Sequence, residues 1–140
     1  MGVANLVGDE NLSAATPHAV QSYQDLIVWQ RGMDLAESCY RITSQFPRQE
    51  IYGLTAQIRR AASSIPANVA EGVGRENTGS FIQHLRISQG SLKELETHLI
   101  LAQRVGLLEE NSLKPLLGAC ETLGKMLRAL IRSLQARRES

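Results

Sequence analysis

A row of basic side chains near the C-terminus is the clearest chemical feature of the sequence. Lys125, Arg128 and Arg132 follow one another at intervals of three and four residues, and Arg137 and Arg138 extend the row without an intervening acidic residue. On a helix this spacing puts side chains on one face. A row of cations is typical of surfaces that bind nucleic-acid phosphates or an acidic protein. It is equally consistent with a solvated face that complements the helix dipole.

Residues that usually catalyse reactions or bind metal ions are few and scattered. His84 and His98 lie far apart along the same predicted helix, and Cys39 and Cys120 fall at apolar positions without forming a Cys-x-x-Cys pair. Glu94 precedes His98 by four residues, but no second helix carries the matching pair that a di-iron bundle needs. Nucleophile and phosphate-loop motifs are also missing. We therefore predict no catalytic residue, no metal site and no cofactor.

Apolar residues at helical spacing indicate the elements that carry these side chains. They recur every three or four residues in four stretches, at about 24–46, 51–74, 78–106 and 111–137. Pro66 lies inside the second stretch, so we expect a kink or short break there. Four helices of this length with short connections pack antiparallel to their neighbours. The sequence predicts an all-α, antiparallel up-and-down four-helix bundle over residues 23–137, after a flexible tail at 1–22.

The third predicted helix has features that a monomeric bundle does not need. Gly90 lies in its middle, where glycine costs about 1 kcal/mol relative to alanine, so we expect close backbone packing or a local function there. Further apolar residues lie away from the main stripes of helices three and four, and such second stripes usually contact another subunit. We therefore expect a homo-oligomer. The apolar residues outside the main stripes are Ile82, Ile87, Ile100, Leu101, Val105, Leu117, Met126 and Ile131.

The overall composition places few limits on partners. The formal net charge is only +1, so the distribution of charge is more informative than its total. The N-terminus lacks the basic and apolar regions of a signal peptide, and apolar runs fall short of the ~18 residues of a membrane span. We expect a cytoplasmic protein without membrane contact.

The predicted second and third helices carry a recognisable pattern. Residues 64–72 read SIPANVAEG and residues 90–96 read GSLKELE, with Gly74-Arg75, Phe81 and Leu85 between them. Residues 23–29, YQDLIVW, open the first helix. Over about residues 23–135 the chain resembles the four-helix-bundle family named for proteins encoded in intervening sequences of bacterial 23S ribosomal RNA genes.

The resemblance implies an assembly and a class of partner. Members of that family form homopentameric barrels of four-helix bundles and are associated with ribosomal RNA through gene context. A related branch contains the accessory variability proteins of diversity-generating retroelements, which are pentamers that bind a reverse transcriptase and its template RNA. The implied partners are further copies of the chain, structured RNA and, for the second branch, a reverse transcriptase.

Polar residues within this pattern have a structural interpretation. Asn68 and Glu71 are three residues apart and share a helix face, which would lie opposite Gly90 and Ser91. We predict a buried polar network of Asn68, Glu71, Ser91 and Arg86 that fixes the register of the two helices, because buried polar groups need partners.

Two functions remain open from the sequence. The first is a non-enzymatic, oligomeric binding protein for structured RNA or an RNA–protein complex, acting through the basic row. The second is a protein–protein scaffold or adaptor with no direct nucleic-acid contact.

Overall fold

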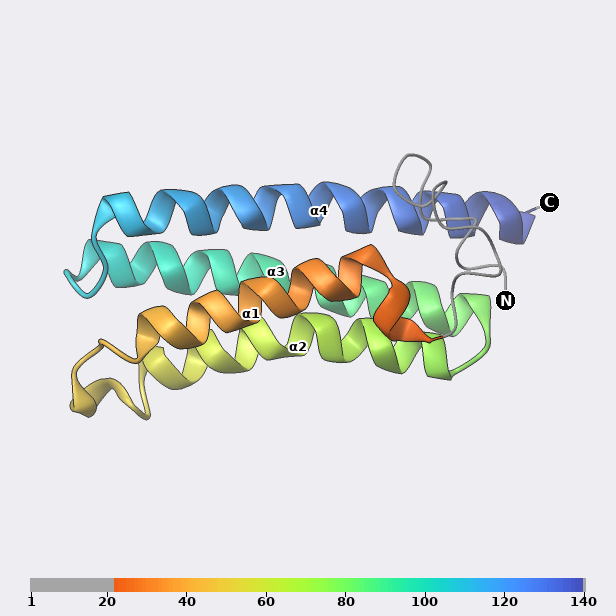
Figure 1. The fold of residues 1–140 in the computed structure, drawn as a ribbon. Coiled ribbons are helices and arrows are strands. Elements are labelled where there is room, and N and C mark those ends of the chain that lie inside the picture. Colours follow the sequence, from red (N-terminus) through yellow and green to blue (C-terminus); the bar gives the residue numbers. More distant parts are fainter. Residues whose placement is uncertain (1–21, 140) are drawn as a thin grey trace.

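The computed structural model describes residues 22–139, with the Glu139 side chain left aside, and these residues form four antiparallel α-helices (Figure 1). The helices are α1 (Ile27–Thr43), α2 (Leu54–Gly74), α3 (Thr78–Arg104) and α4 (Glu110–Glu139). Short 3-10 helices, η3 (Tyr23–Asp25) and η4 (Arg48–Glu50), precede α1 and α2. The described residues contain no strand, so the predicted all-α class is confirmed. Apart from Ser22, the predicted tail lies outside the described residues.

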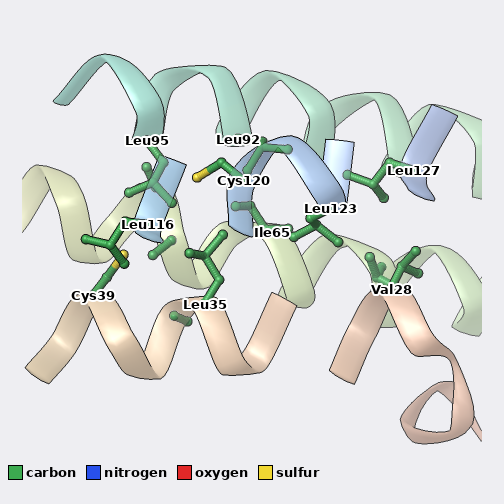
Figure 2. Packing of buried hydrophobic residues seen from close by; sticks show 14 of the residues in the cluster. Val28, Leu35, Cys39, Ile65, Leu92, Leu95, Leu116, Cys120, Leu123 and Leu127 are labelled. Carbon is green, nitrogen blue, oxygen red and sulfur yellow. The ribbon is translucent and has the colours of Figure 1, made fainter. Parts of the chain in front are cut away.

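One continuous apolar core joins the four helices (Figure 2). Leu35 of α1, Ile65 of α2, Leu95 of α3 and Leu123 of α4 are all buried in it, because each helix turns its apolar stripe inward. Each helix contacts the next along the chain, and α4 returns to contact α1. The core therefore closes as a bundle. Within the described residues, no helix is long and apolar enough to cross a membrane.

The two cysteines belong to this core. Cys39 of α1 and Cys120 of α4 are fully buried free thiols. Burial raises the pKa of each thiol to about 12, because a thiolate would be poorly solvated there. Both side chains therefore pack as small apolar groups, in line with the apolar helix positions that they occupy in the sequence.

The closest helix pair is α2 and α3. A methyl group at Gly72 would lie 2.8 Å from Cδ1 of Phe81, so glycine is what allows the helices to approach at this point. In the middle of the pair, the buried Ser88 hydroxyl donates a 2.8 Å hydrogen bond to the Ile65 carbonyl. Helix α2 continues through Pro66 without interruption, so the expected short break is not present.

Helix ends differ by a few residues from the predicted ones. Helix α1 ends at Thr43, before Phe46, and α2 begins at Leu54, because residues 51–53 form a turn after η4. Helix α4 begins at Glu110, one residue ahead of the predicted start at about 111. Asn77 caps α3, where its side chain accepts a 2.9 Å hydrogen bond from the Ser80 amide.

Arg59 of α2 joins that helix to the end of α1. Its Nε donates a 2.8 Å hydrogen bond to the Thr43 hydroxyl, and its Nη2 donates to the Tyr40 carbonyl at 3.3 Å. The guanidinium carbon also lies 4.5 Å from the centroid of the Tyr40 ring. The positive charge of Arg59 interacts favourably with the negative end of the α1 dipole and with the face of the Tyr40 ring. Both interactions stabilise the packing of α2 against α1.

Candidate nucleic-acid interface

The predicted basic row is partly assembled on α4. Lys125, Arg128 and Arg132 are exposed on one side of the helix. Lys125 lies 3.8 Å from the carboxylate of Glu121, but both side chains are largely exposed, so this pair contributes little. Arg128 and Arg132 form no hydrogen bond or ion pair with any described residue. Two guanidinium groups are therefore left available for an external anion.

The last two arginines of the row do not share this side. Helix α4 continues through Arg137 and Arg138 to Glu139, beyond its predicted end at about 137. At 100° per residue they are turned by about 120° and about 140° from Lys125, in opposite directions. The Arg138 guanidinium lies against the start of α3, 3.1 Å from the position that a methyl group at Gly79 would occupy. The expected continuous row therefore ends at Arg132.

Arg86 lies beside the row instead of in a buried network. It is exposed on α3 and turned about 140° from Ser91, which faces α2. Leu92 lies next to Gly124, and this antiparallel register puts Arg86 level with about residue 130 of α4. We call Arg86, Lys125, Arg128 and Arg132 the basic face; it spans α3 and α4.

The predicted polar network contains only two of its four expected members. The Ser64 and Ser91 hydroxyls are 2.8 Å apart, and the Asn68 side-chain amide donates to the Ser64 carbonyl at 2.9 Å and to its hydroxyl at 3.1 Å. Ser64, which the sequence interpretation missed, is the link, and its four-residue distance from Asn68 was the available signal. Glu71 and Arg86 lie outside this group because both are exposed.

Glu71 belongs to a separate ion-pair group at the end of α2. Its carboxylate lies 3.1 Å from Arg75 and 3.6 Å from Nε2 of His84, which comes from α3. The His84 side chain is only 13% exposed, and its Nδ1 atom is buried without a hydrogen-bond partner among the described residues. This group ties α3 to the end of α2 at the surface and does not fill the interior.

A second ion-pair group spans α2 and α3. Arg60 donates a hydrogen bond to the Glu94 carboxylate, and Nε2 of His98 lies 3.4 Å from the same carboxylate. The hydrogen bond from Arg60 is the main reason why the pKa of Glu94 lies below its ordinary value. Arg60 and Arg75 of α2 thus have carboxylate partners, whereas Arg128 and Arg132 of α4 have none among the described residues. The basic face therefore brings together Arg86, Arg128 and Arg132, for which no ion pair is found among the described residues.

The additional apolar residues of α3 and α4 divide into two sets. Ile82 and Ile131 are buried within the protomer, and Leu117 and Met126 are half-buried. The exposed set lies on α3 and its C-cap residue and comprises Ile87, Ile100, Leu101 and Val105.

The surroundings of Gly90 differ from the expectation. A methyl group at Gly90 would have no neighbour within 4 Å, so the expected close packing is not found inside the protomer.

Two grooves run along α1. One, of about 510 Å³, separates α1 from α4 and is lined by residues that include Ile27, Leu116 and Met126. The other, of about 620 Å³, lies between α1 and α2 beside Trp29 and Met33. Neither groove is lined by a residue of the basic face. In the described part of the chain, no set of three or more His, Cys, Asp or Glu side chains is placed to bind a metal ion.

Comparisons with known proteins agree on the fold. The model of the 23S rRNA-intervening sequence protein family matches residues 24–129. A similar solved structure is a protein of unknown function from the S23 ribosomal protein family of Bacteroides thetaiotaomicron, with a TM-score of 0.68 and 22% sequence identity. The alignment covers 75% of this chain and 98% of that protein, and at this identity it supports the fold alone. No curated protein matches the chain.

Proposed function

The chain belongs to the family of 23S rRNA-intervening sequence proteins, and from this membership and its basic face we propose that it is a non-enzymatic binding protein for structured RNA. The observation that carries the proposal is the unpaired pair Arg128 and Arg132, with Lys125 and Arg86 beside them. Phosphate contacts need cations that are not already neutralised by neighbouring carboxylates. The arginines of α2 that pair with Glu71 and Glu94 meet this condition less well.

The proposed partner is a structured RNA or an RNA–protein complex. The family name supports ribosomal RNA, and the related retroelement branch supports a reverse transcriptase with its template RNA. Both partners lie inside the cell, so the proposed place of action is the cytoplasm. Catalysis is not part of the proposal: it assigns the protein an interaction and no reaction.

The proposed assembly is a homo-oligomer, with a pentameric barrel as the form that the family resemblance implies. Exposed Ile87, Leu101 and Val105 support this, because apolar side chains of this size gain about 1.5–3 kcal/mol on full burial. Gly90 lies on the exposed side of the same helix and leaves room for another helix to approach. A ring of five requires two different complementary surfaces on each protomer.

The assembly is tested by light scattering on the purified protein. The unmodified chain is expected at five times the mass of one protomer, and Leu101→Glu is expected to lower this mass while the helical circular dichroism is unchanged. A monomer for the unmodified chain would contradict the proposed assembly.

The exposed apolar residues of α3 also favour a second candidate function, a protein–protein scaffold without nucleic-acid contact. In that case α3 would contact a different polypeptide, and the basic face would be a solvated surface. The two functions predict different responses to salt. Phosphate binding weakens steeply as salt rises because counterions are released, whereas an apolar interface does not.

The RNA-binding function is tested by titrating a labelled, structured RNA with the protein and following fluorescence anisotropy at two salt concentrations. The proposal predicts binding whose log–log dependence on salt has a slope of about −0.9 for each phosphate contact. No binding at low salt would contradict it and would favour the scaffold.

A further inference from the structure

The basic face lacks the side chains that usually hold unpaired bases. Within residues 22–139, the exposed or half-buried aromatic residues all precede α2, and they include Trp29, Tyr40 and Tyr52. Phe81 is the aromatic residue of α3, and it is 3% exposed. Helix α4 contains no aromatic residue. Proteins that bind single strands commonly stack successive bases on aromatic rings, and the basic face provides no such ring.

The shape of the basic face leads to the same conclusion. Helices α3 and α4 run side by side (Figure 1), and the four cations are exposed on them. The two grooves that run along α1 are not lined by any of these residues. Single-strand binders follow the backbone in a positively charged groove, whereas double-helical RNA is recognised by its shape and through its phosphates and 2′-hydroxyls. Exposed cations along two helices can contact the rigid backbone of a duplex.

The cations of the basic face are distributed over two neighbouring helices. Lys125 and Arg132 are about 10 Å apart along the helix axis at 1.5 Å per residue. Arg86 is on the neighbouring helix, whose axis is about 8–10 Å away. A DNA duplex carries one charge per about 1.7 Å of axis, so a 10 Å span presents roughly six phosphates, twice the number on one strand. Cations on two helices can contact phosphates of both strands.

We propose that the basic face binds double-helical RNA through its phosphates, with Arg86 of α3 acting together with Arg128 and Arg132 of α4. This inference rests on the proposed RNA-binding function and specifies the form of RNA that it recognises. It also gives Arg86 a role in RNA binding, whereas the sequence alone assigned Arg86 to a network that fixes the register of two helices.

The test compares two labelled RNAs of equal length, a hairpin of mixed sequence with a long stem and a strand that cannot pair. Binding of the full chain to each is measured by anisotropy at about 50 and about 200 mM salt. Four phosphate contacts predict that the affinity for the hairpin falls roughly 100-fold over this range. The single strand is expected to bind at least tenfold more weakly than the hairpin at the lower salt concentration.

The variant Arg86→Gln tests the part played by α3. It is expected to lower the salt slope for the hairpin by about 1, so that the loss of affinity over the same range becomes roughly 40-fold. Arg48→Gln removes the same charge from exposed η4 and serves as the matched control, with no expected effect. Circular dichroism checks that both variants are folded.

The outcomes separate this inference from the proposed function. Equal or tighter binding of the single strand, or an unchanged salt slope in Arg86→Gln, would overturn the inference while RNA binding itself stands. Failure of the unmodified protein to bind either RNA would overturn both.

Discussion

Two glycines in the bundle are predicted to respond in opposite ways to the same added methyl group. At Gly72 of α2, the methyl carbon of alanine would lie 2.8 Å from Cδ1 and 3.4 Å from Cα of Phe81, and 3.0 Å from Cβ of His84. Because the Cβ atom of His84 is fixed by the backbone of α3, a change of side-chain rotamer alone cannot relieve the 3.0 Å contact. Overpacking of this kind typically costs about 1–3 kcal/mol. We expect Gly72→Ala to destabilise the fold by roughly 1–2 kcal/mol.

Gly90→Ala is the matched comparison on α3. No atom lies within 4 Å of the added methyl group, and Gly90 is in the interior of a helix with ordinary backbone geometry. Alanine is favoured over glycine in a helix interior by about 0.8–1 kcal/mol, partly because it restricts the unfolded chain. We therefore expect Gly90→Ala to stabilise the protomer by roughly 0.5–1 kcal/mol.

Both variants are measured by urea unfolding, followed by far-ultraviolet circular dichroism and analysed by linear extrapolation. Measurements at several protein concentrations are needed because assembly adds stability by mass action. Equal stability of the two variants, or a Gly72→Ala protein more stable than the unmodified chain, would refute the described closeness of α2 and α3. Destabilisation by Gly90→Ala only at assembling concentrations would mean that Gly90 is covered by another copy.

Three further predictions concern the polar contacts between helices. Arg59→Ala should destabilise the fold by about 1–2 kcal/mol in thermal or urea unfolding, because it removes a charged hydrogen bond to the end of α1 and the stacking on Tyr40; an effect below the error of the fit would contradict this. Glu71→Ala should lower the free energy of unfolding by less than about 1 kcal/mol, because the ion pairs of Glu71 are exposed. A larger loss of stability would instead support the buried network predicted from the sequence. The pKa of Glu94 lies below its ordinary value of 4.5, so its ion pair stabilises the fold above that pH and this contribution is lost as the pH falls through the lowered pKa. A pH series of melting temperatures should therefore show a smaller acid-induced loss for Glu94→Gln than for the unmodified chain, and parallel curves would contradict the assignment.

The fold could be predicted from the sequence because helix periodicity and burial are local signals. Leu85, Leu92 and Leu99 repeat every seven residues, and each is buried in the structure. Such repeats specify which side of a helix faces the core even when the neighbouring helix is not known. Helix ends were less predictable because Gly53 and η4 delay α2 through backbone geometry that composition does not reveal.

The candidate site was only partly predictable because it depends on helix phase and register. The spacing of Arg128 and Arg132 was enough to place them on one side of α4, but placing Arg138 required knowing that the helix continues. Two residues on the same helix face can still have different neighbours. Asn68 forms a hydrogen bond with Ser64, whereas Glu71 forms ion pairs with Arg75 and His84. The position of Arg86 beside α4 follows from the antiparallel register, which a single sequence does not contain.

Removing the two unpaired arginines of the basic face together shows whether this face is the RNA interface. RNA binding by Arg128→Ala/Arg132→Ala is compared at low salt with Arg31→Ala/Arg48→Ala, which removes two exposed arginines from α1 and η4 with the same change of charge. The first variant is expected to lose most of its affinity and about two units of salt slope, while the control binds as the unmodified chain does. Equal affinity of the two variants would contradict RNA binding by the basic face.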